Sequence, residues 1–335
     1  MKWQSSWRVL LFVLAGMLCL GCGSESAATL SEPELVDAQG TKVPVVLSPQ
    51  RILTFTSGTD EIVLGLVSPR KMAGINEDLA NPSRSNVATL AKQISVRLPR
   101  NPSIEAVAAL RPDLVFVQSW IEAEKIEALR SLGILVVVCR TPANLEDVKF
   151  NIRLIAYATG EREQGEKLIG KMQHKITQIT QQVEALPAEE KQRSIALISI
   201  MGGYGGSGCT FDEMCKYAGA SNAKAGAGNQ NGQVMSKEQL VQLNPDYLFL
   251  PVYENAEERE NAYGAEYITD PSLASMTAIQ KNHIGRPWAR YIYNVSQNIV
   301  FGMQETAWVL YGDQFWQDHK QHLSVADDKE GTIAQ

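Results

Sequence analysis

One stretch of fifteen residues occurs twice in this chain and constrains its fold more than any other feature. It runs from Ser103 to Val117 and again from Ser236 to Leu250, and six positions are identical. Each copy opens with a serine that caps a short helix, a glutamate in the first turn of that helix, and apolar residues at helical spacing. The chain then turns at Pro-Asp and ends in a buried apolar strand. The copies start 133 residues apart, about one domain length. The repeat therefore predicts two similar α/β lobes.

The residues around the first copy alternate between strand and helix patterns. Strands separated by helices indicate a parallel sheet, so we predict that fold class for both lobes. In the first lobe the expected strands are Arg51–Phe55, Lys71–Ile75, Leu114–Val117 and Ile134–Val138, and the expected helices are Asp60–Leu66, Ile104–Leu110 and Glu122–Leu132.

Some forty residues after Leu145 carry apolar side chains at helical spacing, interrupted at Gly160 and ended by Pro187. This region contains no Gly/Ser linker, so we expect two helices that form a stiff joint. The second lobe is expected to add a strand at Ser194–Ile200, helices at Ala274–Gln280 and Phe301–Phe315, and a short strand at Tyr291–Tyr293. We therefore predict an N-terminal lobe at 37–144, a bridging helical region at 145–187, a C-terminal lobe at 188–320 and a tail at 321–335.

The N-terminus has the pattern of an export signal. Lys2 and Arg8 precede an almost wholly apolar run that is too short to span a bilayer comfortably, which favours a cleaved signal peptide over residues 1–21. The step Leu20-Gly-Cys22 resembles the lipobox of bacterial lipoproteins, although Cys19 stands where leucine is usual. Cys22 is then expected to carry the lipid and residues 22–36 to form a flexible tether; the alternative is an ordinary signal peptide.

Charge and cysteine content exclude some classes of function. The formal net charge is −6 and no basic cluster occurs, which argues against a nucleic-acid partner. Beyond the export segment and Cys22, three cysteines remain. Cys139 ends an apolar run and is read as a small buried residue. Cys209 and Cys215 are close enough for a disulfide, which the sequence leaves open; a metal site made of two thiolates is less favoured.

Taken together, the export signal, the lipobox-like cysteine, the Thr-Asp-Glu-Ile segment at 59–62 and the doubled Glu and Pro-Asp units resemble one family, the iron-chelate and cobalamin class of ABC-importer solute-binding proteins. The resemblance covers residues 37–318. It implies two lobes bridged by a long helix, with the ligand bound in the cleft between them. It also implies that Glu105 and Glu238, one on each lobe, dock onto arginines of the membrane subunits. The other interpretation is that each glutamate only complements its helix dipole.

Three features could instead indicate catalysis. Gly203, Gly205 and Gly208 match the dinucleotide fingerprint G-x-G-x-x-G, but no acidic residue for the ribose follows before Glu238. The segment around Ser207 departs from the nucleophile-elbow pattern G-x-S-x-G, because Cys209 stands where the last glycine is required. His283 could serve as a base or as an axial haem ligand, yet the chain has only four histidines and no paired metal motif. We therefore expect no enzyme, no catalytic residue, no intrinsic cofactor and no resident metal.

A large planar or chelated ligand calls for aromatic faces and cations at strand ends. Trp120 and Tyr253 stand at equivalent distances beyond the two repeat strands, which predicts aromatic walls on opposite sides of one cleft. The full set of expected ligand contacts is Thr56, Ser57, Gly58, Thr59, Arg97, Arg100, Trp120, Tyr204, Tyr253, Arg290 and Tyr291.

These patterns predict an exported, lipid-anchored and monomeric binding protein that delivers a ferric siderophore, haem or corrinoid to an ABC permease and ATPase complex. The arginines favour an anionic ligand, whereas the aromatic residues suit all three. The alternatives are a sensor or scavenger of the same fold and, less favoured, an exported enzyme that uses the glycine-rich loop.

Overall fold

The structure is a computed structural model, and it describes residues 35–46, 48–253, 264–318 and 322–327. The export segment, Cys22 and nearly all of the expected tether lie outside the described residues. Helices and strands alternate along the described chain, and every pair within the named strands is parallel. The predicted class, α/β with parallel sheets, is confirmed.

The first lobe is built on a three-stranded sheet in the order β1-β4-β5. Its register pairs Ile52 with Leu114 and Val115 with Val136, and all three strands are buried. The elements are β1 (Ile52–Thr54), α1 (Ser57–Leu66), β2 (Ile75–Asn76), α2 (Ala88–Ala91), β3 (Arg97–Leu98), α3 (Ile104–Ala109), β4 (Leu114–Gln118), α4 (Ala123–Ser131) and β5 (Val136–Cys139), with 3-10 turns η1 (Pro69–Lys71) and η2 (Glu77–Ala80).

The second lobe is built on a four-stranded sheet in the order β7-β6-β8-β9. Its elements are β6 (Ser194–Leu197), α7 (Thr210–Tyr217), β7 (Ser221–Asn222), α8 (Ala223–Gly226), α9 (Lys237–Leu243), β8 (Tyr247–Phe249), α11 (Ala265–Ile268), α12 (Thr277–Gln280), β9 (Ile284–Gly285), α13 (Ala289–Ile292) and α14 (Ile299–Tyr311), with 3-10 turns η3 (Ala188–Glu190), η4 (Pro271–Leu273), η5 (Asp313–Phe315) and η6 (Val325–Asp327).

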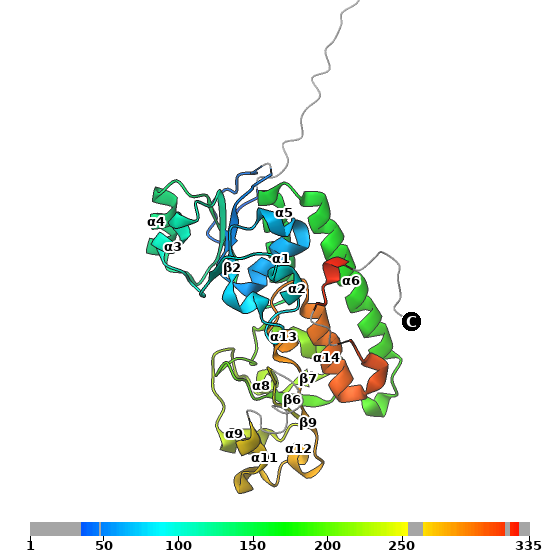
Figure 1. The fold of residues 1–335 in the computed structure, drawn as a ribbon. Coiled ribbons are helices and arrows are strands. Elements are labelled where there is room, and N and C mark those ends of the chain that lie inside the picture. The colour runs from blue at the N-terminus through cyan, green and yellow to red at the C-terminus, as the bar shows by residue number, and fades with distance from the viewer. Residues whose placement is uncertain (1–34, 47, 254–263, 319–321, 328–335) are drawn as a thin grey trace, which may run out of the picture. The chain divides into compact units, whose positions relative to one another are not determined.

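Two helices connect the sheets. They are α5 (Leu145–Thr159) and α6 (Arg162–Glu184), and the expected break lies at Gly160, whose φ of 78° ends α5 in the left-handed region. Helix α6 runs past α5 and α1 as far as α14 (Figure 1). The division at Gly160 is thus confirmed, while the lobe boundaries given above stay predictions.

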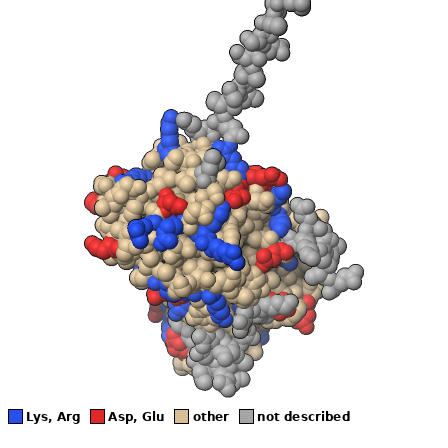
Figure 2. Space-filling model, turned by 45° about the horizontal axis from the view of Figure 1, so that its top comes forward, with Lys and Arg blue, Asp and Glu red and all other residues tan. Residues whose placement is uncertain are grey.

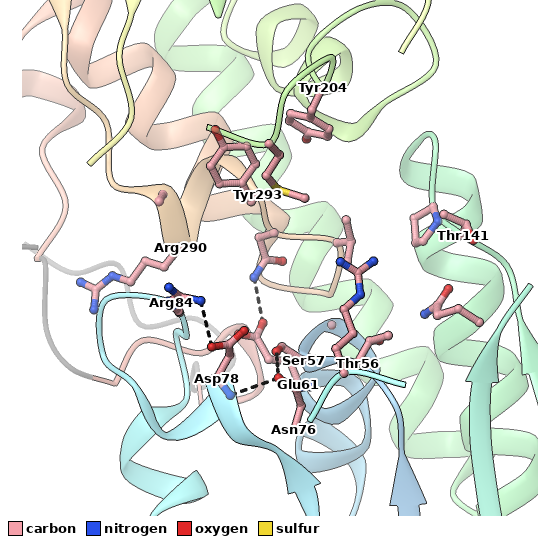
Figure 3. A pocket seen from close by; sticks show the side chains of 18 of the residues that line it. Thr56, Ser57, Glu61, Asn76, Asp78, Arg84, Thr141, Tyr204, Arg290 and Tyr293 are labelled. Carbon is pink, nitrogen blue, oxygen red and sulfur yellow. Dashed lines mark hydrogen bonds and ion pairs between the residues drawn. The ribbon is translucent and has the colours of Figure 1, made fainter. Parts of the chain in front are cut away.

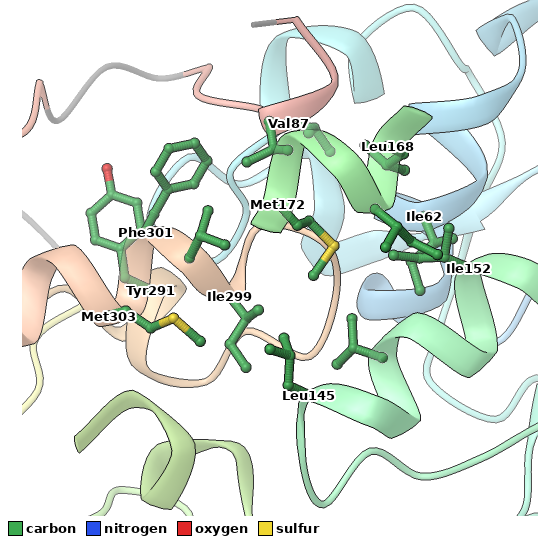
Figure 4. Packing of buried hydrophobic residues seen from close by; sticks show 14 of the residues in the cluster. Ile62, Val87, Leu145, Ile152, Leu168, Met172, Tyr291, Ile299, Phe301 and Met303 are labelled. Carbon is green, nitrogen blue, oxygen red and sulfur yellow. The ribbon is translucent and has the colours of Figure 1, made fainter. Parts of the chain in front are cut away.

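A continuous apolar core surrounds these helices. It includes Ile62 of α1, Ile152 of α5, Met172 of α6 and Ile299 of α14 (Figure 4). Because residues from both ends of the chain share this core, the joint between the sheets is packed rather than hinged on a loop. Among the residues that the structure describes, no helix combines the length and apolarity needed to cross a membrane.

Two strand predictions differ from the structure. The expected strand at Tyr291–Tyr293 is wrong, because residues 289–292 form helix α13. Helix α13 packs against α14 at Gly302, where a Cβ would lie only 2.6 Å from the Tyr291 carbonyl oxygen. Tertiary packing has therefore overridden the strand preference of the aromatic residues. Of the expected strand at Lys71–Ile75, Lys71 ends the 3-10 turn η1, Met72 forms an isolated parallel bridge with Ile52, and β2 begins only at Ile75.

Candidate functional site

A cavity of about 420 Å³ opens where the carboxyl ends of strands from both lobes meet (Figure 3). Its walls come from the segments that follow β1, β2, β3, β4, β5 and β8, from the glycine-rich loop after β6, and from residues 289–295. Ligands of parallel α/β folds bind at the carboxyl ends of strands. The cavity also falls within the size range of small-molecule sites.

Eight of the eleven residues that the sequence assigned to the ligand line this single cavity, although they come from segments far apart in the chain. They are Thr56, Ser57, Gly58, Arg100, Trp120, Tyr204, Tyr253 and Arg290.

The other three assigned residues do not line the cavity. Thr59 is 2% exposed and its hydroxyl lies 2.8 Å from both Thr56 Oγ1 and Gln118 Nε2, so it supports lining residues from behind. The Arg97 guanidinium donates to the carbonyl oxygens of Ala91, which ends α2, and of Val96. Tyr291 lies in the apolar core.

His283 also lies away from the cavity. Its ring stacks on Tyr247 with centroids 4.5 Å apart, and Nδ1 is 3.2 Å from the Asp246 carbonyl oxygen. Within the described ranges, no three His, Cys, Asp or Glu side chains come together as a metal site.

The three described cysteines are free and buried, so Cys209 and Cys215 are not joined. Burial raises the pKa of both thiols. Neither is therefore a thiolate at neutral pH.

Arginine side chains lie over aromatic rings on both lobes. Arg100 lies 4.8 Å from the centroid of Trp120, and Arg84 lies 4.9 Å from that of Tyr253. Arg84 also forms an ion pair with Asp78 at 3.0 Å. Burial raises the pKa of the Tyr253 hydroxyl, so this ring stays neutral beside the guanidinium. Both pairs present a flat aromatic surface edged by positive charge.

Tyr204 and Tyr293 form a second aromatic group, with ring centroids 5.2 Å apart. The Tyr204 hydroxyl lies 2.9 Å from Thr210 Oγ1, and burial raises its pKa well above the ordinary value. The Tyr293 hydroxyl lies 3.1 Å from Ser199 Oγ and accepts from the Ile200 amide at 3.1 Å. These bonds fix both rings at the end of β6.

The glycine-rich loop owes its three fingerprint glycines to close packing and to backbone conformation. A Cβ at Gly203 would lie 2.2 Å from the Gly232 backbone, whereas Gly205 and Gly208 have φ of 108° and 77°. Lys224 Nζ donates to the Tyr204 carbonyl oxygen at 3.3 Å, which holds the loop further. The fingerprint-like spacing is therefore explained without a dinucleotide.

Sequence reasoning missed several lining residues, notably Glu61, Asn76, Asp78, Arg84 and Tyr293. Asn76 and Asp78 could have been found, because they end or follow strand β2 in a parallel fold. Glu61 and Tyr293 carried no such signal, since one lies inside a helix and the other in a segment read as a strand.

Glu105 and Glu238 occupy the same place on two helices, in the first turns of α3 and α9. Both are exposed. A hydrogen bond from its own backbone amide, and then one from the capping serine, lowers the pKa of each carboxyl. Each helix therefore carries a solvent-facing negative charge at neutral pH.

The surface carries charges of both signs. Figure 2 shows Lys and Arg side chains in the middle of one face with Asp and Glu side chains around them. This face lacks the unbroken basic stripe typical of a nucleic-acid interface.

Comparison with known proteins agrees with this geometry. A family model described as periplasmic binding protein matches residues 52–286. A cobalamin-binding protein of Halobacterium salinarum is 22% identical over 267 residues, covering 76% of this chain and 70% of the relative. The petrobactin-binding protein YclQ of Bacillus subtilis is 22% identical over 308 residues, covering 82% and 89%. The apo periplasmic heme-binding protein RhuT of Roseiflexus superposes with a TM-score of 0.67 at 19% identity, covering 78% of this chain and 98% of RhuT.

Proposed function

The chain belongs to the periplasmic binding protein family, a family of substrate-binding proteins rather than enzymes, and we propose that it captures a metal chelate and delivers it to an ABC importer. The observation that carries the proposal is that one cavity brings together aromatic rings and guanidinium groups from both lobes. The names of the relatives support it, because they include binders of cobalamin and petrobactin.

The charges at the cavity favour an anionic chelate, such as a ferric siderophore or haem, over a corrinoid. Three lining residues are arginines and two are carboxylates, Asp78 and Glu61, so the arginines are in excess by one even after the ion pair between Arg84 and Asp78 is set aside. Trp120 and Tyr253 offer faces on which a flat or chelated group can stack.

Ligand titration tests this proposal. Protein lacking residues 1–22 would be titrated with haemin, ferric petrobactin and cyanocobalamin, with visible absorption and native mass spectrometry as readouts. We expect one-to-one binding, tightest for one of the two anionic probes. Tightest binding of cyanocobalamin would contradict the charge argument, and no binding of any probe would contradict the ligand class.

We further propose that Glu105 and Glu238 dock onto the permease. One exposed carboxylate on each lobe gives a two-point electrostatic match to a pseudo-symmetric partner. Charge reversal of both residues to lysine should stop uptake in cells and leave ligand affinity unchanged. Glu124→Lys is a matched control, since Glu124 is exposed in the first turn of α4. Loss of ligand affinity in the double variant would refute the docking role.

The lipid anchor is a third part of the proposal and lies outside the described residues. Cys22→Ser should release the protein from the membrane fraction, because removing the thiol removes the attachment point. A membrane-bound Cys22→Ser protein, or a wild-type protein without lipid mass, would contradict the anchor.

A further inference from the structure

The carboxylate of Glu61 is buried at the floor of the cavity and collects donors from outside its own lobe. Its side chain belongs to α1, and the residue is 3% exposed. Oε2 accepts hydrogen bonds from Asn294 Nδ2 at 2.8 Å, Ser296 Oγ at 2.5 Å and Asn298 Nδ2 at 3.0 Å. Oε1 accepts from the Asn86 amide at 3.2 Å.

The two sides of this cluster are fixed to different sheets. Next to Glu61, Asp60 accepts hydrogen bonds from Thr54 Oγ1 of β1 at 2.6 Å and from the Asn76 amide of β2 at 2.8 Å, which ties α1 to the first lobe. Next to Asn294, Tyr293 is tied to Ser199, just after β6 of the second lobe. The Glu61 carboxylate thus connects the two lobes directly.

Glycines on the same side of α1 bring the second segment close. A Cβ at Gly58 would lie 2.5 Å from Val295 Cγ2, and one at Gly65 would lie 3.0 Å from Gln297 Nε2. The same Gln297 Nε2 donates to the Glu61 carbonyl oxygen at 2.7 Å. Residues 58, 61 and 65 follow one another at intervals of about one helical turn and so lie on the same face of α1. Residues 294–298 pack against this face.

The C-terminal segment closes the cluster into a ring. The Leu323 amide donates to the Asn86 carbonyl oxygen at 2.8 Å, and the Val325 amide donates to Asn298 Oδ1 at 3.0 Å. Asn86 and Asn298 are two of the residues that donate to Glu61. The ring therefore runs from Glu61 through both asparagines to residues 323–325.

We infer that Glu61 is a positioning residue that sets the separation of the two cavity walls; the part that concerns ligand affinity rests on the proposed function. A buried carboxylate is costly unless several donors satisfy it, and here three of the four side-chain acceptor contacts, those from Asn294, Ser296 and Asn298, come with the other lobe. Moving the lobes apart would leave the charge buried and unpaired. Lining residues flank the ring on both sides, Ser57 and Gly58 on one and Tyr293 to Val295 on the other. The walls are thus held at a fixed spacing before ligand arrives, which lowers the cost of binding.

The test compares variants of this ring by distance and affinity. Nitroxide labels on Ser131→Cys in α4 and Lys281→Cys after α12 report the inter-lobe distance, since both sites are exposed and the three described native thiols are buried. We expect a narrow distance distribution in the ligand-free protein. Glu61→Gln turns an amide donor towards the asparagine donors, so it should broaden the distribution. The variant should also bind the tightest-binding probe, whether haemin, ferric petrobactin or cyanocobalamin, about tenfold more weakly. This is the loss expected when only about a tenth of the protein molecules have the wall spacing that binds ligand.

Ser296→Ala is the milder variant if Glu61→Gln does not fold, and it should shift both readouts in the same direction. Thr306→Val is the matched control, because its buried hydroxyl bonds within α14, to the Gly302 carbonyl oxygen. An unchanged distance distribution in the Glu61 and Ser296 variants would overturn the inference, and so would a broadened distribution with unchanged affinity. If the wild-type protein binds none of the probes, the ligand proposal fails, while the distance distribution still decides whether Glu61 sets the wall spacing.

Discussion

Asp113 and Asp246 stand at the same position of the repeated unit, and each anchors the strand beside it. Asp113 accepts hydrogen bonds from the amides of Gln50 and Arg51, where β1 begins. Asp246 accepts from the Ser194 amide at 2.9 Å and from its hydroxyl at 2.8 Å, where β6 begins. The residue two positions earlier is left-handed in both copies, with φ of 45° at Arg111 and at Asn244. The duplication has therefore preserved the joints of the scaffold.

The two lobes differ beyond the strand ends. In the first lobe Arg100 covers Trp120 of the same lobe, whereas the ring of Tyr253 in the second lobe is covered by Arg84 from the first. The first lobe supplies most of the polar and charged wall, and the second supplies Met201 and three tyrosines. The scaffold is alike in the two lobes while the cavity is asymmetric, because its lining residues lie outside the repeat.

The largest expected effect tests whether both aromatic walls contribute. Trp120→Ala and Tyr253→Ala should each weaken binding of the best probe about ten- to a hundredfold, because an aromatic anchor that becomes buried on binding is worth roughly 2 kcal/mol or more. Titration calorimetry measures this, with the exposed Trp316→Ala as control. If only one variant loses affinity, the ligand uses one wall and the equivalence of the two positions does not extend to function.

The strand anchors should matter next, and about equally. Asp113→Ala and Asp246→Ala each leave backbone amides at a strand start without a charged acceptor, so each should lower the free energy of unfolding by about 1–3 kcal/mol. Urea unfolding gives the values. A loss confined to one variant would show that the copies share sequence here but not stability.

A pH-dependent effect should separate the two lobes. Burial raises the pKa of Asp60 to about 8 from its ordinary 3.8, against the hydrogen bonds from Thr54 and Asn76. The folded protein then holds a proton that the unfolded chain releases. Its contribution to stability is fully present below about pH 4 and is lost as pH rises towards 8, by at most about 1.4 kcal/mol per pH unit.

Asp60→Asn should remove this slope, because asparagine does not titrate. The variant should still fold, since its amide can donate to Thr54 Oγ1 and its carbonyl oxygen can still accept from the Asn76 amide. Asp212 near the start of α7 is the second-lobe control, because it is only partly buried. The free energy of unfolding, measured from pH 4 to 8, should fall with pH in the wild-type protein and in Asp212→Asn but not in Asp60→Asn. An equal slope in Asp60→Asn would contradict the raised pKa.

The smallest expected effect has opposite signs in the two copies. Arg111→Gly should raise the free energy of unfolding by up to about 1 kcal/mol, because glycine adopts a left-handed φ without strain. Asn244→Gly should lower it by about the same amount, since the Asn244 side chain accepts from the Thr277 amide at 2.7 Å and donates to its hydroxyl at 3.1 Å. Melting temperatures report both, and changes of the same sign would contradict this distinction.

Local sequence patterns predicted those residues of the site that directly follow a strand. Thr56, Trp120 and Tyr253 follow strands, and parallel strands bring their carboxyl ends together, so these residues could be named without a structure. Arg97 was assigned as a cation before the first repeat helix and Tyr291 as an aromatic residue near an expected strand, and in the fold both have other partners. The helix at 289–292 depends on packing against Gly302, a contact that no local window contains.

The sequence by itself determined that one α/β unit occurs twice, that a broken helical segment joins the copies, and that aromatic residues end equivalent strands, because each of these follows from spacing along the chain. Only the tertiary structure decided which arginine lies on which ring, that Cys209 and Cys215 remain apart, and that Glu61 meets Asn294, Ser296 and Asn298. Those contacts join residues up to 237 positions apart. Their energy comes from burying charge and polar groups against partners that only the packed core brings within reach.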